Sequence, residues 1–188
     1  MTGASSGATR IGSTAPQALE FFAGIGLARL GLEEAGFHVA WSNDIDHAKC
    51  QMYRNQFGNN EQEHTLIEGD MGELHGSDLP HDISIAWGSS PCTDISLAGT
   101  RTGLNGKQSS AFWQYIRLLE EMGNNRPPVA VLENVTGLAT SHSGEDIAAA
   151  VSAFNQLGYS VDALSIDARR FVPQSRPRLF LVGLTNPP

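Results

Sequence analysis

The sequence predicts an α/β fold built on a mostly parallel, doubly wound sheet. From residue 17 onward, apolar runs of strand length alternate with segments of helical spacing, which is typical of strand–helix–strand units. One run, PVAVLEN, is almost continuously apolar, as expected of a strand buried on both faces. Glycine-rich or polar residues follow several predicted strands, and ligands bind at the carboxyl ends of strands in such sheets.

The first half of the chain is predicted to contain four strands and two helices. Residues 1–16 are mainly Gly, Ser, Thr and Ala, so we expect a flexible tail followed by one domain over 17–188. Gly36 closes the first predicted helix. In order, the elements are QALEFF (strand, 17–22), 25–36 (helix), HVAWSN (strand, 38–43), 46–57 (helix), HTLIEG (strand, 64–69) and HDISIAW (strand, 81–87).

The second half is predicted to contain two helices and three strands. A helix over 109–122 places Phe112, Ile116, Leu119 and Met122 on one face, and a serine is available to cap it. A second helix is expected to open at Ser143 with Glu145 and Asp146, to bury Ile147, Val151, Phe154 and Leu157, and to stop at Gly158. The strands are 128–134, 159–166 and 178–184.

Composition excludes several classes of protein. No apolar run approaches the ~20 residues of a membrane span, and no signal peptide is readable. Two cysteines argue against a disulfide scaffold or a cysteine-built zinc site, and a cytoplasmic setting is expected. The net charge of −8 argues against a strongly DNA-binding module.

The charge is unevenly distributed along the chain. Residues 1–100 carry 4 Lys+Arg and 13 Asp+Glu, a net of −9, whereas residues 101–188 carry 8 and 7, a net of +1. An anionic partner is therefore expected near the basic residues of the second half: Arg101, Lys107, Arg169, Arg170, Arg176 and Arg178.

Three predicted strand ends suggest a cofactor that contains adenosine. Phe22-Ala23-Gly24-Ile25-Gly26 follows the first strand, and its glycines let a ligand approach the backbone. Asp44 after the second strand is placed to bind ribose hydroxyls, and Asp70 after the third to accept from an adenine amino group. Each feature also has a purely structural interpretation, as a turn glycine or a helix cap.

Two further strand ends carry reactive groups. Cys92 follows a Gly-Ser-Ser-Pro turn, where a thiolate can be supported, whereas Cys50 has the helical spacing of a buried apolar residue. Glu133 ends an apolar run and is expected to be partly desolvated, which suits proton donation; the alternative is a structural pair with an arginine. Gln174, Arg176 and Arg178 would share one face of an extended segment, or form a solvated basic edge.

These residues together resemble the catalytic domain of the cytosine-5 DNA methyltransferases. The matching motifs are FFAGIG, SNDID, GD (69–70), GSSPC (88–92), LENV (132–135) and QSRPR (174–178), in the family's order from about residue 17 to 184. The resemblance implies a Rossmann-like S-adenosylmethionine-dependent methyltransferase fold with an antiparallel C-terminal strand. It also implies a bacterial or phage setting such as restriction-modification.

The resemblance also implies a mechanism. The cofactor would be S-adenosyl-L-methionine, giving S-adenosyl-L-homocysteine, with no metal; the partner would be double-stranded DNA with a flipped-out cytosine. Cys92 would attack ring carbon 6, Glu133 would donate to nitrogen 3, and Arg178 would contact the exocyclic oxygen. Asn134 and Arg176 would support the site. Cofactor binding would involve Phe22, Ala23, Gly24, Ile25, Gly26, Asp44, Ile45, Asp70, Met71 and Pro91.

The sequence departs from the family at several places, among them GKQSSAFW, which stands at the fifth motif without its usual arginine-glycine form. Thr-Asp-Ile-Ser follows Cys92, and Asp94 places a negative charge near the thiol. The target-recognition domain and the last motifs of the family are not visible. We therefore expect the chain to be a fragment or one subunit of a split enzyme, and to need a missing domain or a partner subunit that recognises the DNA sequence. The alternatives are an RNA cytosine-5 methyltransferase and a cofactor-binding subunit that is inactive without a partner.

Overall fold

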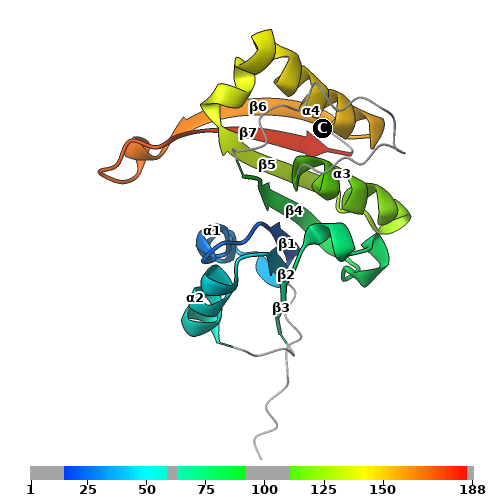
Figure 1. Ribbon diagram of the computed structural model, residues 1–188, viewed down its shortest axis with the longest axis vertical. Helices are drawn as coiled ribbons and strands as arrows, with labels where there is room; N and C mark the ends of the chain where they lie inside the picture. Colours follow the sequence, from blue (N-terminus) through cyan, green and yellow to red (C-terminus); the bar gives the residue numbers. More distant parts are fainter. Residues whose placement is uncertain (1–14, 59–62, 92–110, 186–188) are drawn as a thin grey trace, which may run out of the picture.

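The protein is organised around one seven-stranded sheet, seen in the computed structural model (Figure 1), which describes residues 15–58, 63–91 and 111–185. The strand order is β3-β2-β1-β4-β5-β7-β6. The strands are β1 (Gln17–Phe21), β2 (His38–Asp44), β3 (Thr65–Glu68), β4 (Ile83–Ser89), β5 (Val129–Val135), β6 (Ser160–Asp167) and β7 (Pro177–Leu184). All seven predicted strands are therefore confirmed, with small changes at their ends.

Pairing within the sheet is parallel except at β7. The pairs β1–β2, β1–β4, β2–β3 and β4–β5 are parallel, whereas β7 runs antiparallel to both β5 and β6. The mostly parallel, doubly wound α/β fold with an antiparallel C-terminal strand is confirmed. Because β6 and β5 point the same way, the β6–β7 connection emerges at the edge where the parallel strands end.

Four α-helices cover the sheet in the described residues. They are α1 (Leu27–Glu34), α2 (His47–Phe57), α3 (Ala111–Glu121) and α4 (Glu145–Gln156). Leu32 of α1 packs with Ala18 and Val39 on one face, whereas α3 and α4 contribute to the larger cluster on the other. None of the helices described is long and apolar enough to cross a membrane.

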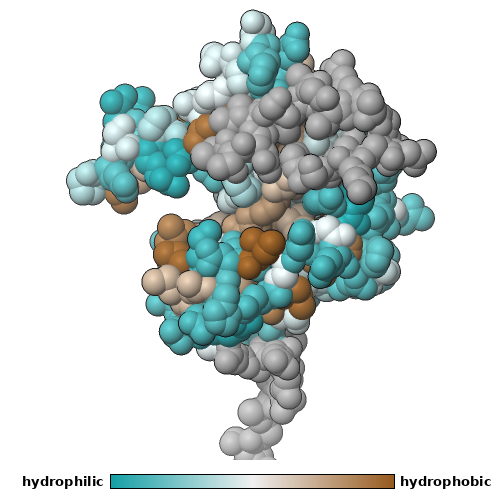
Figure 2. All heavy atoms as spheres, viewed as in Figure 1, coloured by the Kyte–Doolittle hydropathy of each residue, from teal (hydrophilic) through white to brown (hydrophobic). Residues whose placement is uncertain are grey.

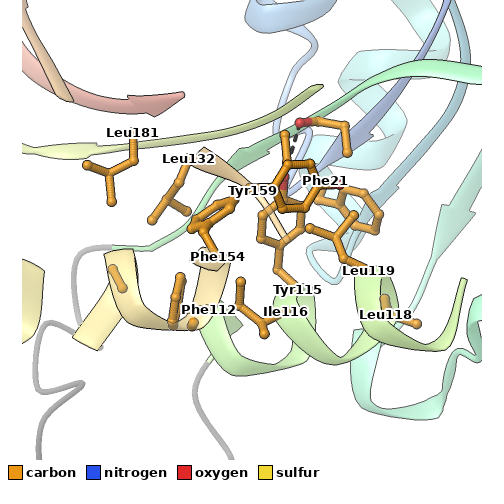
Figure 3. Packing of buried hydrophobic residues seen from close by; sticks show 14 of the residues in the cluster. Phe21, Phe112, Tyr115, Ile116, Leu118, Leu119, Leu132, Phe154, Tyr159 and Leu181 are labelled. Atoms are coloured by element: carbon orange, nitrogen blue, oxygen red, sulfur yellow. Dashed lines mark hydrogen bonds between the residues drawn. The ribbon is translucent and has the colours of Figure 1, made fainter. Parts of the chain in front are cut away.

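The larger cluster is dominated by aromatic rings held between α3, α4 and the strands (Figure 3). Tyr115 lies edge-on to Phe21 at 5.1 Å between ring centroids, and Phe154 lies edge-on to Tyr159 at 5.9 Å. The Tyr115 hydroxyl donates to the backbone carbonyls of Ala86 (3.0 Å) and Val131 (3.2 Å). This side chain therefore fixes α3 against β4 and β5, the two strands whose ends carry the predicted reactive groups.

The start of α4 differs from the prediction. Gly144 is the N-cap residue and no side chain caps the helix, whereas Ser143 has a left-handed backbone (φ 57°) and does not act as the cap. The Asp146 carboxylate, fully buried, instead accepts from Ser141 Oγ (2.6 Å) and is paired with His142 Nδ1 (2.7 Å). The acidic first turn thus holds the preceding loop. The serine proposed to cap α3 lies outside the described residues.

Candidate active site

The turn from β1 to α1 folds tightly over the ends of β1 and β2. Phe22 and Gly24 both have φ 57°, and Gly26 has φ 86°. The N–H of Ala23 donates to the carbonyl of Asn43 (2.9 Å), and the N–H of Gly26 donates to that of Ala23 (2.9 Å). A left-handed conformation costs a residue with a side chain about 1–2 kcal/mol, so the strain at Phe22 is offset by these contacts.

The two glycines of this turn have different surroundings. A Cβ on Gly24 would meet nothing within 4 Å, so open space adjoins its backbone. A Cβ on Gly26 would overlap the Phe57 ring and lie 2.9 Å from Tyr53, because α2 approaches closely there. Gly26 therefore has a packing role, whereas Gly24 leaves room for a ligand. Ile25 between them is 43% exposed.

Asp44, at the end of β2, holds this turn. Its Oδ2 accepts from the N–H of Gly24 (2.8 Å) and its Oδ1 from the N–H of Asp46 (2.9 Å). The cap of α2 is Asp46, which accepts from Lys49 N, so Asp44 is not the helix cap that its position allowed. Ile45 beside it is 69% exposed and offers apolar surface to a flat ring.

The end of β3 is tied to the end of β2 by an asparagine. Asn43 Nδ2 donates to the carbonyls of Ile67 and Gly69, both at 3.0 Å. Asp70 caps the short 3₁₀ helix η1 (Met71–Glu73) by accepting from Gly72 N (2.8 Å). This contact is the helix cap that the sequence left open as a structural interpretation of Asp70. Met71 is buried, with 5% of its surface exposed. The first three strand ends therefore lie side by side, as predicted.

Glu133 and Arg178 form an ion pair where β5 meets β7. Arg178 Nε lies 2.8 Å from Glu133 Oε1, and each side chain is 20% exposed. The register aligns Val135 with Arg178, so β7 delivers the arginine to the end of β5. The two predicted groups are thus adjacent, and the contact is the arginine pair that the sequence left open as an alternative for Glu133.

Asn134 connects β5 to the loop that leaves β4. Its Nδ2 donates to Ser90 Oγ (2.9 Å) and lies 3.4 Å from the Ser90 carbonyl, while its Oδ1 accepts from Val135 N (2.8 Å). Both side chains are buried, whereas Pro91 is exposed. Cys92 lies outside the described residues, as do Asp94, Arg101 and Lys107. The contact fixes the backbone two residues before the predicted nucleophile.

The expectation that Gln174, Arg176 and Arg178 share one extended face is wrong for Gln174. β7 begins at Pro177, and Gln174 lies in a bend that precedes it, whereas the carbonyl of Arg176, just before β7, accepts from the N–H of Ala168. The Gln174 N–H donates to the carbonyl of Val172 (2.8 Å), which is a bent and not an extended backbone. Both side chains are exposed, and Arg178 alone reaches the candidate site.

Sequence reasoning missed Glu20, which is fully buried in β1 beneath the glycine turn. Its carboxylate accepts from Arg29 N (3.0 Å), Ser42 Oγ (2.9 Å) and the Tyr53 hydroxyl (3.0 Å), and burial raises its pKa. His64 stacks on Tyr53, and burial lowers the pKa of its ring to about 4. The available signal was an acidic residue inside the apolar run ALEFF.

This arrangement defines the class of protein: an α/β domain with a glycine turn and two acidic strand ends on one side, and a glutamate–arginine pair beside a proline loop on the other. The C-5 cytosine-specific DNA methylase family matches residues 17–188. The chain belongs to this family, as its motifs indicated. Among the described residues, no cluster of three or more His, Cys, Asp or Glu side chains is arranged to hold a metal ion.

Curated relatives of this chain include bacterial Type II methyltransferases. The chain is 32% identical over 175 residues to the Type II methyltransferase M.NgoFVII of Neisseria gonorrhoeae, covering 92% of this chain and 44% of the relative. It is 30% identical over 180 residues to M.Eco47II of Escherichia coli, covering 95% and 42%. The chain therefore spans about half the length of the curated relatives that it matches.

Solved structures share the fold. The Dnmt2 methyltransferase of S. pombe superposes with a TM-score of 0.70 at 23% identity, covering 92% of this chain and 52% of that chain. A Spodoptera frugiperda DNMT2 mutant gives 0.71 at 19% identity, with 92% and 51% coverage.

Proposed function

We propose that this chain is the catalytic portion of a DNA (cytosine-5-)-methyltransferase that transfers a methyl group from S-adenosyl-L-methionine through a covalent Cys92 intermediate. The observation that carries the proposal is the meeting of Glu133, Arg178 and Asn134 at the ends of β5 and β7, beside the loop that leads to Cys92. Membership of the methylase family supports the same chemistry.

The residues at the first three strand ends fit the proposed cofactor. Open space beside Gly24 admits a ligand against the backbone, and exposed Ile45 provides an apolar surface for adenine. Each oxygen of the Asp44 carboxylate accepts one N–H and retains a lone pair for a ribose hydroxyl. Asp70 is exposed at the next strand end. When bound, S-adenosyl-L-methionine supplies a methyl group on a positively charged sulfur.

The chain's own residues make cytosine carbon 5 reactive. The Cys92 thiolate adds to carbon 6 while Glu133, taken up for this step in its protonated carboxylic acid form and not as the carboxylate of the ion pair, donates a proton to nitrogen 3. Carbon 5 thereby becomes an enamine-like nucleophile. After methylation of carbon 5, a base takes the proton from that carbon and the electron pair expels Cys92 as thiolate. The proton on nitrogen 3 returns, and the aromatic ring is restored.

In this mechanism Arg178 and Asn134 position the reacting groups, and Arg178 also places a positive charge beside Glu133. Arg178 engages Oε1 of Glu133. Among the described residues none is hydrogen-bonded to the other carboxylate oxygen, which is therefore available to the cytosine ring. Arg178 also presents further N–H donors to the exocyclic oxygen of cytosine. Asn134 holds Ser90 and thereby the approach of the Cys92 loop.

Covalent trapping tests the proposal directly. We expect the chain, mixed with S-adenosyl-L-methionine and a duplex containing 5-fluorocytosine, to give a covalent adduct at Cys92 by mass spectrometry, because fluorine cannot leave as a proton. Cys92→Ser should abolish the adduct while S-adenosyl-L-homocysteine still binds in calorimetry. Cys50→Ala is the matched control, because Cys50 is buried and its pKa is raised by burial; its adduct should persist.

Each other outcome points to a different function. The chain can be tested alone and together with the part of a curated relative that it does not span. Cofactor binding without an adduct in both cases would favour a cofactor-binding subunit without catalysis. Trapping on 5-fluorocytosine RNA in preference to DNA would favour an RNA methyltransferase. An adduct that survives Cys92→Ser would mean that another residue is the nucleophile.

A further inference from the structure

A loop at the tip of the β6–β7 hairpin stands apart from the rest of the molecule. It comprises residues 168–176 and includes the 3₁₀ helix η8 (Ala168–Arg170). Figure 1 shows this hairpin reaching beyond the body of the sheet, and Figure 2 shows a notch between it and the part of the molecule that contains α1 and α2. Since β7 also carries Arg178, the tip continues directly from the candidate active site.

The hairpin is a basic segment of an acidic chain. Residues 160–184 carry 4 Lys+Arg and 2 Asp+Glu, a net of +2, whereas the remaining residues carry 8 and 18, a net of −10. Arg169, Arg170 and Arg176 are all exposed in the tip. Arg178 is paired with Glu133 and Arg169 with Asp167, so among the described residues the unpaired positive charge of the hairpin comes from Arg170 and Arg176.

The arginines of the tip keep donors for a ligand. Arg169 lies 3.1 Å from Asp167 through Nε and is 69% exposed, which leaves its terminal N–H groups on the surface. Within the described parts of the chain, neither Arg170 nor Arg176 has an ion-pair partner. Guanidinium groups with free N–H donors are well suited to phosphate.

The tip is held in shape without a core of its own. One carboxylate, that of Asp167, accepts from Arg169 N (3.1 Å), Arg176 N (2.8 Å) and Ser175 Oγ (3.0 Å). Phe171 is nonetheless 80% exposed and Val172 48% exposed. An ordered loop that presents three arginines and a bare aromatic ring is organised to contact something outside the chain.

We propose that Arg169 and Arg170 form a phosphate-binding tip that anchors duplex DNA beside the active site, with Phe171 packing on the adjoining sugar. The choice of DNA rests on the proposed function, and charge complementarity favours it over a protein partner. Phosphate contacts supply most of the sequence-independent affinity for a duplex. The tip thereby gives an acidic chain a local site for a polyanion.

The register sets where the contact falls on the duplex. Ile166 pairs with Arg178, and Arg169 follows three residues later, at most ~11 Å along the backbone. Successive phosphates of one strand advance ~3.4 Å along the helix axis. The tip therefore reaches phosphates within about three nucleotides of the cytosine that Glu133 and Arg178 would receive.

Salt dependence of binding tests the tip independently of catalysis. A fluorescent 20-bp duplex is titrated with the chain at several salt concentrations from about 50 mM upward. The slope of log affinity against log salt is negative, and for Arg169→Gln/Arg170→Gln its magnitude should decrease by about 1.8, since each lost phosphate contact removes ~0.9. The control Lys49→Gln/Arg54→Gln removes two charges from α2 and should leave the slope unchanged.

A second arm locates the contact. Neutral methylphosphonates about three nucleotides from a 5-fluorocytosine should weaken binding by the unaltered chain and have little effect on the arginine variant. No duplex binding by the unaltered chain at ~50 mM salt, or equal slopes for variant and control, would overturn the proposal. A protein partner would be assigned to the tip instead if the arginine variant and the control gave equal salt slopes and a protein bound the chain with an affinity that depends on Phe171.

The outcomes separate the two proposals. Loss of slope in the arginine variant without any Cys92 adduct would keep the phosphate-binding tip and reject the methyl-transfer function. An adduct with unchanged slope would do the reverse. Tighter binding to an RNA duplex than to the DNA duplex would overturn the assignment to DNA.

Discussion

Replacing Gly26 by alanine is expected to destabilise the protein because two costs coincide at this residue. Its φ of 86° is a left-handed conformation, which costs a residue with a Cβ about 1–2 kcal/mol. The new methyl group would also overlap the Phe57 ring and lie 2.9 Å from Tyr53, and overpacking of this kind costs about 1–3 kcal/mol. The lower entropy of the unfolded chain offsets about 0.4–1 kcal/mol. The net loss in free energy of unfolding is therefore about 1–5 kcal/mol.

Gly36 offers a matched control for this substitution. Its φ is 91°, but a Cβ there would meet nothing within 4 Å. Gly36→Ala should therefore show the backbone cost alone, about 1 kcal/mol. Urea denaturation followed by circular dichroism measures both variants against the unaltered chain. A loss for Gly26→Ala no larger than that for Gly36→Ala would refute the close approach of α2 to the glycine turn.

Three further perturbations address the core, the buried network and the hairpin tip. Tyr115→Phe should lower the free energy of unfolding by about 1–2 kcal/mol, because two buried carbonyls lose their donor; urea denaturation checks this. The His64 pKa of about 4 lies below the usual 6.5, so its contribution to stability is complete above pH 6.5 and is lost as pH falls toward 4. His64→Gln should flatten that part of the stability profile. Asp167→Ala should speed hydrogen exchange at the Arg169 and Arg176 amides more than tenfold, and unchanged protection would contradict the role of this carboxylate.

The strands and helices were predictable because their apolar patterns are local. The continuous run in β5 correctly indicated burial on both faces, and Gly36 ends the segment that contains α1. The antiparallel direction of β7 came from the family resemblance, because a parallel and an antiparallel buried strand have the same apolar pattern. Ser143 was misassigned as a cap because a serine beside acidic residues matches a capping pattern whatever its own backbone conformation.

The candidate site was predictable where it depends on strand ends and not where it depends on turns. Glu133 and Arg178 meet because the ends of neighbouring strands meet. Gln174 was misplaced because the chain bends where its N–H donates to the carbonyl of Val172, and no local apolar pattern indicates that bend. Glu20 was missed because its partners come from β2 and α2, and no local pattern reveals them.

The central position of β1 has a consequence for the order in which the sheet is built. β1 pairs with β2 on one edge, but its other edge pairs with β4, which is completed about 45 residues after β2. At a synthesis rate of ~5–20 residues per second, that edge waits about 2–9 s for its partner. During this interval the nascent chain exposes the unpaired backbone of an apolar strand, which is a hazard for aggregation. The strand that supports the glycine turn is thus one segment that needs protection while the protein is being made.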